Sequence, residues 1–470
     1  MSLTLTMESH SNNHIDAVFE HLRGLAGGPP PDVRERLDLL RELKTVVRTS
    51  TNEICEAVHS DFGKSDVEAE LTEIATVLLE LRSALSNLER WAAPRRIKAG
   101  FPFWTTRSQV VTQPKGIVLI ISPWNYPILL SLAPIVSAIA AGNRVILKPS
   151  EQTPDTSALM SRLLDRALGA DWCAVVQGDA AAGAHLLTKP FDHFFFTGSP
   201  EIGRIVMKAA ADHWCSATLE LGGKSPAIVD DTADIELAAE KIVIGKYLNA
   251  GQTCIAPDFV LAHETIYKDL VQALVEQAST IDDRHAASMT GIIDNRHAER
   301  LTSLWEEARR RGAVKHDGDS LDLGKVSIIT GVPDGARIMQ EEIFGPLLPV
   351  LRYSSLDDIV RVLARLGPPL TSYVFTRSDR FARSIRNRLK TGSICQNEML
   401  LHFAHPNLPF GGVGKSGHGR THGHSGFLTF SNEISVLEQR WGRGILPLLF
   451  PVTRQIQHHL RAWFLRFLGR

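Results

Sequence analysis

Residues 116–151 read GIVLIISPWNYPILLSLAPIVSAIAAGNRVILKPSE, and this stretch decides the fold. The apolar runs Ile117–Ile121 and Arg144–Leu147 have the length and composition of buried strands. Between them, residues 128–141 have the length of a helix. A strand, a helix and a second strand in this order predict two parallel strands joined by a crossover helix.

The same alternation continues along the chain on both sides of this unit. Because strands and helices alternate, we expect parallel sheets covered by helices on both faces, and 470 residues are enough for two such α/β domains. The other expected helices cover residues 31–92, 157–167, 202–211 and 235–247, and the other expected strands cover residues 108–112, 173–176, 193–196, 227–229 and 259–261.

The composition narrows the class of protein. A formal net charge of −1 gives no reason to expect nucleic acid as a partner. Five scattered cysteines without a CxxC pair argue against a disulfide framework and against a zinc or iron–sulfur site. The polar N-terminus does not look like a signal peptide, and no apolar run reaches the roughly 20 residues of a membrane-spanning helix. We therefore expect a cytoplasmic protein.

The C-terminal tail, residues 441–470, differs from the rest of the chain. From Arg440 onward there are six arginines and no acidic residue. An apolar stripe at helical spacing predicts a basic amphipathic helix over residues 454–468. We expect this helix either to pack on the body of the protein or on a second copy of the chain, or to lie on an anionic membrane surface. The stripe consists of Ile456, Leu460, Trp463, Phe464, Phe467 and Leu468.

Cys254 is the candidate nucleophile. The segment YLNAGQTC, residues 247–254, ends a helical stretch at Gly251 and presents the cysteine among small polar residues. Backbone N–H groups exposed there would lower the pKa of the thiol and raise its thiolate fraction. The ordinary alternative, a small buried apolar side chain, is the interpretation for the other four cysteines. These are Cys55, Cys173, Cys215 and Cys395.

Glu220 and Asn125 are the candidate base and oxyanion donor. Leucines flank Glu220, which suggests a partly desolvated carboxyl with a raised pKa, although a lone glutamate is more often a solvated surface charge. Asn125 lies in a stiff Pro-Trp-Asn-Tyr-Pro turn after a buried strand, where its amide could donate to an oxyanion. A turn-forming asparagine is the plain alternative.

The sequence has two kinds of glycine-rich segment, which differ in how well they match a phosphate-binding site. Residues 194–203 read as a strand, a glycine turn and a helix start, which can hold a phosphate, but their G-x-x-x-x-G spacing is not the dinucleotide fingerprint. Residues 411–416 and 222–225 imitate a P-loop without its first glycine, so we reject nucleoside triphosphate hydrolysis. His418, His422 and His424 favour a loop over a metal site.

Seven segments together resemble the aldehyde dehydrogenase superfamily, in the family's order and over about 300 residues. The resemblance covers residues 30–435 and is greatest to class 3, the fatty or aromatic aldehyde group. It does not account for the tail. The segments are PWN125YP, K148PSE151, FTG198S199, LE220LGGK, G251QTC254, EE342IF344GP and P409FGG.

The resemblance implies roles for three catalytic residues. Cys254 would attack a long-chain or aromatic aldehyde to form a thiohemiacetal, which loses a hydride to NAD(P) and leaves a thioester. The Asn125 amide would stabilise the oxyanion, and Glu220 would activate the water that releases the carboxylic acid.

The resemblance also implies a dinucleotide site. Lys148 and Glu151 would contact the adenosine ribose, Trp124 and Ser199 the pyrophosphate, and Glu342 and Phe344 the nicotinamide ribose. The Glu151 carboxylate would repel a 2′-phosphate, so NAD is expected, with NADP as a second cofactor. Pro200 stands where the family more often has threonine, which removes one N–H near the phosphates. The remaining expected cofactor contacts are Ser150, Gly198, Gly203 and Leu221.

The family fold implies three parts, besides the tail of residues 441–470, and a homodimer. A Rossmann-type cofactor domain would comprise residues 1–94 and 115–221, and an α/β catalytic domain residues 222–425. Residues 95–114 and 426–440 would form the oligomerisation strands. No metal site is expected.

Two other functions stay open at this point. A CoA-acylating dehydrogenase would pass the thioester to CoA, although such chemistry avoids a strong water-activating base like Glu220. A non-catalytic descendant of the fold would not need Cys254, Glu220, Asn125 and Glu342 together.

Overall fold

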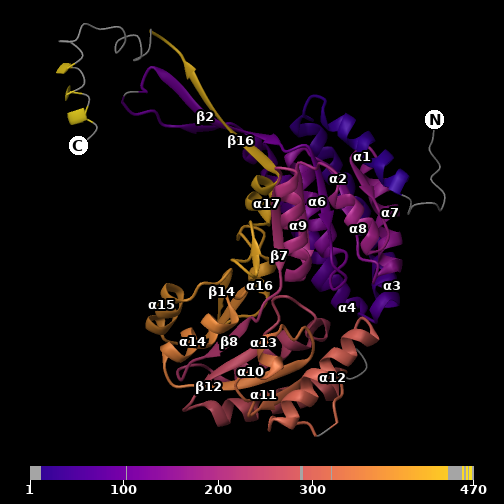
Figure 1. Cartoon of the computed structure of the whole chain (residues 1–470), viewed down its shortest axis with the longest axis vertical. Coiled ribbons are helices and arrows are strands. Elements are labelled where there is room, and N and C mark those ends of the chain that lie inside the picture. Colours follow the sequence, from indigo (N-terminus) through magenta and orange to yellow (C-terminus); the bar gives the residue numbers. More distant parts are fainter. Residues whose placement is uncertain are drawn as a thin grey trace.

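The computed structural model describes residues 12–101, 103–285, 289–318, 320–442, 458–459, 462–463 and 465–467. Two α/β lobes lie one above the other, and a long β-sheet arm projects from the upper lobe (Figure 1). Each lobe is built on its own mixed sheet. The expected fold class, two α/β domains with a Rossmann-type first domain, is confirmed.

The upper lobe is built on a six-stranded sheet in the order β15-β7-β6-β3-β4-β5. The expected unit of strand, helix and strand is present as β3, α6 and β4, with β3 parallel to β4. Only the short β15 runs antiparallel to its neighbour. The strands are β3 (Ile117–Ile121), β4 (Arg144–Lys148), β5 (Cys173–Val175), β6 (His193–Gly198), β7 (Ser216–Leu221) and β15 (Gly417–His418).

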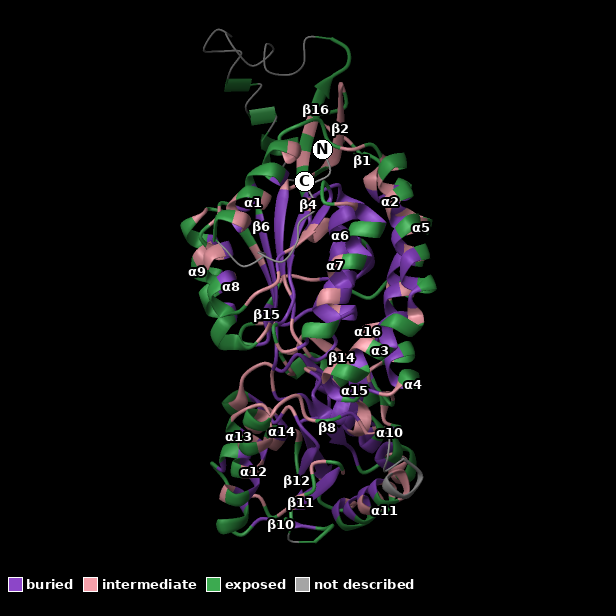
Figure 2. Cartoon of the chain, turned by 90° about the vertical axis from the view of Figure 1, so that its right-hand side faces the viewer, coloured by how far each residue is buried: buried purple, intermediate pink, exposed green. Residues whose placement is uncertain are grey.

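Both faces of this sheet are buried, because successive side chains of a strand point to opposite faces. Val118 and Ile120 pack into one core with α2, α3, α5, α6 and α7, whereas Ile117 and Leu119 pack into another with α1, α8 and α9. The strands are accordingly buried and the outer helix faces exposed (Figure 2). The helices are α1 (Asn12–Ala26), α2 (Val33–Thr49), α3 (Thr51–Phe62), α4 (Asp66–Ala69), the π-helical turn η1 (Glu70–Ile74), α5 (Ala75–Ala92), α6 (Leu129–Ala141), α7 (Pro154–Leu168), α8 (Ala180–Leu187), α9 (Pro200–Asp212) and α17 (Gly423–Thr429).

The lower lobe holds a seven-stranded sheet in the order β10-β11-β12-β9-β8-β13-β14. Helices α10 and α11 cover one face, and α12 to α15 cover the other. The strands are β8 (Pro226–Val229), β9 (Phe259–His263), β10 (Val314–Lys315), β11 (Ser327–Thr330), β12 (Leu347–Tyr353), β13 (Thr371–Phe375) and β14 (Ser393–Gln396). The helices are α10 (Ile235–Tyr247), η2 (Leu248–Gly251), α11 (Tyr267–His285), α12 (Asn295–Arg310), α13 (Arg337–Gln340), α14 (Leu356–Leu366), α15 (Asp379–Arg388) and α16 (Leu401–Ala404).

The arm is a three-stranded sheet of β1 (Arg95–Ile97), β2 (Thr106–Pro114) and β16 (Ser431–Gln439). Strands β2 and β16 pair antiparallel over their full lengths. Several apolar side chains on and near the arm are exposed, among them Ile97 and Leu437.

The expected tail helix lies largely outside the described residues. Of its six apolar positions, only Trp463 and Phe467 are described, and their rings lie 5.6 and 4.7 Å from the ring of Phe101. Among the described residues, no helix is both long and apolar enough to cross a bilayer.

Over residues 31–261 the sequence-based elements match the structure closely, although residues 31–92 form four helices and a π-helical turn, and β1, β7 and η2 were not predicted. Beyond residue 261, the residue pattern predicted no helix or strand except the tail helix. Helix α10 has the expected bounds, and most others differ by a few residues at their ends. Helices α1 and α8 were not predicted. The expected domain boundaries stay a prediction, although β15, inside the segment 222–425, pairs with β7 of the upper lobe.

Candidate active site

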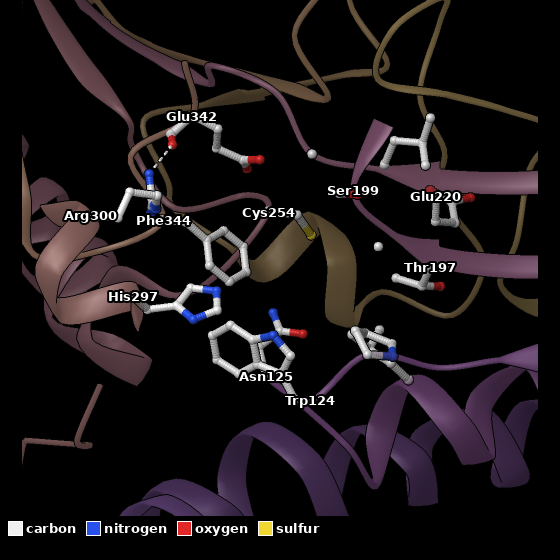
Figure 3. A pocket seen from close by; sticks show the side chains of 15 residues that line it. Trp124, Asn125, Thr197, Ser199, Glu220, Cys254, His297, Arg300, Glu342 and Phe344 are labelled. Atoms are coloured by element: carbon white, nitrogen blue, oxygen red, sulfur yellow. Dashed lines mark hydrogen bonds between the residues drawn. The ribbon is translucent and has the colours of Figure 1, made fainter. Parts of the chain in front are cut away.

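A cavity of about 250 Å³ is lined by residues from both lobes (Figure 3). Nine of the thirteen residues that the sequence singled out line it together. They are Trp124, Asn125, Gly198, Ser199, Glu220, Leu221, Cys254, Glu342 and Phe344.

The fold brings these residues together because parallel strands end at a common edge. Trp124 and Asn125 follow the carboxyl end of β3, Gly198 ends β6, and Leu221 ends β7. Ser199 is the N-cap of α9, and its hydroxyl accepts from the N–H of Ile202 at 3.4 Å. Pro200 has no N–H, and the N–H groups of Ile202 and Gly203 donate to Ser199, which leaves the N–H of Glu201 at this helix start to bind an anion.

Cys254 lies on a loop whose backbone is held from several sides. Asn249, Ala250 and Gly251 all have positive φ angles between 52° and 70°. The N–H of Asn249 donates to Glu68, and the Gln252 side chain donates to the carbonyl of Asn249 at 3.0 Å. A Cβ on Gly251 would collide with the carbonyl of Gly345, so only glycine fits there.

The thiol of Cys254 has a raised pKa, and the expectation of a lowered one is wrong. Burial is the main cause, followed by the carboxyl groups of Glu342 and Glu220. The N–H groups of Cys254 and Ile255 do lower the pKa, as expected, but they do not outweigh burial. In the protein alone the thiol is thus mostly protonated at neutral pH.

We expect the rate of Cys254 alkylation by iodoacetamide to keep rising with pH from 7 to 10, because only the thiolate reacts. Burial raises the pKa of Glu342 to about 8, so its carboxylate opposes the thiolate above that pH. Glu342→Gln should therefore move the alkylation profile to lower pH. The alkylation measured in Cys254→Ala comes from the other thiols and is subtracted. An alkylation rate of Cys254 that is already constant above pH 6 would contradict the raised pKa of this thiol.

Glu220 is buried, with only 7% of its surface exposed, beside the cavity. Neither carboxyl oxygen has a hydrogen-bond partner in the described part of the chain. Burial raises its pKa well above the ordinary value, and the nearby charge of Arg420 offsets this in part. The expected desolvated carboxyl is therefore present, and its free oxygens suit a proton acceptor.

Asn125 is fixed by hydrogen bonds on its side chain and on its backbone. Its amide nitrogen donates to the carbonyl of Gln252 at 2.9 Å. Its own carbonyl accepts from Lys64 at 3.2 Å and from Asn249 at 2.9 Å. An amide nitrogen carries two N–H groups, so the second can serve an oxyanion near Cys254.

Two aromatic rings, those of Trp124 and Phe344, line the cavity together. The rings of Trp124 and Phe344 lie edge to face with centroids 5.4 Å apart. Phe344 has a φ of 49°, an unusual conformation for a bulky residue that is often found at functional sites. A Cβ on Gly222 would collide with the carboxyl of Glu342, so glycine there makes room for that side chain.

The other four predicted residues are not among those that line the cavity. The Lys148 ammonium, itself buried, donates to Glu151 at 2.6 Å, and the Glu151 side chain is 48% exposed. The Ser150 hydroxyl accepts from the N–H of Gln152 at 3.2 Å. Gly203 packs against Leu221, and a Cβ there would lie 2.6 Å from that side chain.

The sequence missed two polar residues of α12 that line the cavity. His297 lies 5.3 Å from the Trp124 ring and bonds Asp294 at 2.7 Å. Arg300 donates to the carbonyls of Glu342 and Ile343 and so holds the backbone of that segment. No motif surrounds either residue, and nothing in the sequence marked α12 as a neighbour of the cavity.

The known protein sequences that this chain resembles belong to one family. The model of the aldehyde dehydrogenase family matches residues 30–436. A Pseudomonas aeruginosa protein named "Probable coniferyl aldehyde dehydrogenase" is 38% identical over 467 residues, covering 97% of each chain. Mouse "Aldehyde dehydrogenase family 3 member A2" is 36% identical over 455 residues, covering 95% of this chain and 93% of the mouse protein.

Solved structures are similar over almost the whole chain. A substrate-bound structure of Staphylococcus aureus AldH has a TM-score of 0.89 at 35% identity, covering 96% of this chain and 99% of that one. An NAD⁺ complex of an aldehyde dehydrogenase from Bacillus cereus has a TM-score of 0.82 at 27% identity, covering 91% and 89%.

Proposed function

Because the chain belongs to the aldehyde dehydrogenase family, with class 3 members among its relatives, we propose that it oxidises an aldehyde to a carboxylic acid through a thioester on Cys254. The chain is an aldehyde dehydrogenase; the proposal concerns its mechanism, cofactor and substrate. One observation carries it: a thiol, a buried carboxyl without a partner and a fixed amide line the same cavity.

The residues around the cavity fit a nicotinamide dinucleotide. The N-terminus of α9, with Gly198 and Ser199, suits the pyrophosphate, and Trp124 would pack beside it. Glu342 would hold the nicotinamide ribose, with Phe344 against it. Lys148, Ser150 and Glu151 would contact the adenosine ribose, while Gly203 and Leu221 would keep α9 close to the sheet. A bound dinucleotide supplies the hydride acceptor.

In the first half of the reaction, the sulfur of Cys254 attacks the aldehyde carbon and a C–S bond forms. The thiol of Cys254 gives its proton to water before attack, and the N–H groups of Cys254 and Ile255 stabilise the resulting thiolate. The aldehyde oxygen becomes an oxyanion, to which Asn125 and the Cys254 N–H donate. Oxidation of this thiohemiacetal leaves a thioester on Cys254.

In the second half, Glu220 removes a proton from water, and the hydroxide attacks the thioester carbon. The C–S bond then breaks, releasing the carboxylic acid and the Cys254 thiolate. A raised pKa makes Glu220 a stronger base than an ordinary carboxylate, which suits it to activate water.

We expect NADH to form from NAD and an aldehyde without CoA, measured by absorbance at 340 nm. Strict dependence on CoA would support the acylating reaction instead, and no NADH with any aldehyde would support a non-catalytic protein. We propose a long-chain or aromatic aldehyde, since apolar side chains pack around Cys254 and one relative is named for coniferyl aldehyde.

For the cofactor we propose NAD, with NADP accepted less well. The half-exposed Glu151 carboxylate would repel a 2′-phosphate. We expect Glu151→Gln to raise kcat/KM with NADP by about tenfold, because removing a like charge is worth on the order of 1–2 kcal/mol. Glu276→Gln, at an exposed position of α11 in the lower lobe, is the matched control. A preference for NADP in the unmodified enzyme would contradict the proposal.

We also propose a cytoplasmic homodimer that associates through the arm, whose apolar side chains are exposed. The basic tail would either cover the partner or the substrate entrance, or bind an anionic membrane surface. Sedimentation with anionic liposomes, with and without residues 445–470, separates these outcomes, and equal sedimentation of both forms removes the membrane alternative.

A further inference from the structure

A buried ion pair lies directly behind Asn125, on two residues that the proposed reaction does not use. Lys64, just after α3, and Glu73, in η1, are both fully buried, and the Lys64 Nζ donates to Glu73 Oε1 at 2.7 Å. The same ammonium donates to the backbone carbonyl of Asn125 at 3.2 Å and lies 4.0 Å from the centre of the Tyr126 ring. Lys64 and Glu73 are not among the residues that line the cavity, so any effect on the reaction passes through Asn125.

Glu73 holds the same turn at a second point. Its Oε2 accepts from the N–H of Ile128 at 2.8 Å and from that of Leu129 at 3.4 Å. Each oxygen of Glu73 thus receives a hydrogen bond from a group that can only donate, as a carboxylate requires. The ion pair therefore holds the Pro-Trp-Asn-Tyr-Pro turn by the carbonyl of Asn125 and by the N–H of Ile128, three residues further on.

A second buried carboxyl, that of Glu68, holds the loop of Cys254 from the same helical segment. It accepts from the N–H of Asn249 and from the hydroxyl of Thr290 at 2.8 Å. Residues five apart lie about 140° apart around a regular α-helix, but a π-helical turn brings them to one face. The turn η1 lies between Glu68 and Glu73 and lets both carboxyls point inward. Such turns are rare and frequent at functional sites.

Hydrogen bonds join the Asn125 turn to the Cys254 loop. The Asn125 amide donates to the carbonyl of Gln252 at 2.9 Å, and the Asn249 amide donates to the carbonyl of Asn125 at 2.9 Å. Asn125 and Cys254 both line the cavity (Figure 3). The place of the Asn125 amide relative to the sulfur thus depends on the same carbonyl that Lys64 holds. An error of about 1 Å in such a geometry can cost on the order of 100-fold in rate.

Stability alone does not explain an ion pair at this place. Taking two charges out of water costs about as much free energy as their attraction contributes, so buried pairs stabilise little more than apolar side chains do. We propose that Lys64 and Glu73 are positioning residues, which orient the Asn125 amide toward the oxygen of the aldehyde that Cys254 attacks. The inference rests on the proposed function and adds the residues on which its oxyanion donor depends.

The double variant Lys64→Met/Glu73→Gln tests this, because it removes both charges at once and the glutamine oxygen can still accept from the N–H of Ile128. We expect kcat/KM for the aldehyde, at saturating NAD, to fall about tenfold or more. The Kd for NAD, measured by the quenching of tryptophan fluorescence, should stay within about twofold, because the pair acts on the aldehyde step. The matched control is Lys315→Met/Asp317→Asn, which removes a 2.8 Å ion pair with a buried lysine from the lower lobe and should keep its activity.

The same double change made in Asn125→Ala separates positioning from general structure. Asn125→Ala alone should lower kcat/KM by about 10²–10³-fold, and it leaves the backbone carbonyl that Lys64 holds. We expect the added loss of the ion pair to cost less than about twofold, because no side-chain amide remains to be misplaced.

An equal fold loss with and without the Asn125 amide would show a purely structural role and overturn the inference. Full activity of Lys64→Met/Glu73→Gln also overturns it and leaves the proposed function intact, whereas full activity of Asn125→Ala removes both the inference and the proposed oxyanion donor. If the double variant does not fold, Lys64→Gln enters the same comparison, because its amide can still donate to Glu73 but the side chain is one atom shorter.

Discussion

Replacing Cys254 by alanine is expected to lower kcat for aldehyde oxidation by on the order of 10⁵-fold, to the limit of detection. Without sulfur no covalent adduct can form, and a free aldehyde or its hydrate is a far poorer hydride donor than a thiohemiacetal. The side chain is small and only partly buried, so the fold should survive its truncation. NADH formation at 340 nm with a saturating aldehyde measures the effect.

The matched control is Cys215→Ala, a half-buried thiol that does not line the cavity. It should keep its activity. NAD binding to Cys254→Ala, measured by the quenching of tryptophan fluorescence, would show that the variant has lost the chemical step and has kept the cofactor site. Retention of even a tenth of the activity in Cys254→Ala would contradict covalent catalysis by this residue.

The second large effect is expected for Glu220→Gln, which should reduce steady-state kcat by about 10²–10⁴-fold. The amide has nearly the same shape but cannot take a proton from water, so the thioester persists. The first turnover does not need this base, so a rapid burst of about one NADH per active site should remain. Stopped-flow absorbance resolves the burst from the slow phase.

Glu240→Gln, an exposed glutamate on α10, is the control and should turn over normally. A Glu220→Gln enzyme that loses the burst and the steady state together would show that the carboxyl is needed before the thioester forms. Normal steady-state turnover would mean that another group activates water.

Much of the fold could be predicted because local patterns and tertiary structure agree. The runs at residues 117–121 and 145–147 are apolar at every position, as is typical of buried parallel strands. Helix α10 was predicted with its observed bounds, whereas α8 has only eight residues, at the lower limit of helix length that a sequence pattern identifies. Helix α1 lies before a Gly-Pro-rich segment, where the pattern of alternating elements had not yet begun.

The sequence predicted only those site residues that lie in recognisable motifs. Asn125, Glu220 and Cys254 lie far apart in the chain, and the resemblance, rather than the spacing, indicated that they meet. His297 and Arg300 reach the same cavity from α12 without any motif. The direction of the Cys254 pKa was wrong for a related reason: the N–H groups are local, but burial and the carboxyls of Glu220 and Glu342 come from distant segments.

Mass spectrometry of Glu220→Gln, quenched in acid during the first second after mixing with NAD and an aldehyde, tests the central claim most directly. We predict that the peptide containing Cys254 gains the mass of the acyl group, in an amount equal to the NADH burst, and that hydroxylamine removes it. An NADH burst with an unmodified Cys254 peptide, or with the acyl group on another residue, would contradict the account.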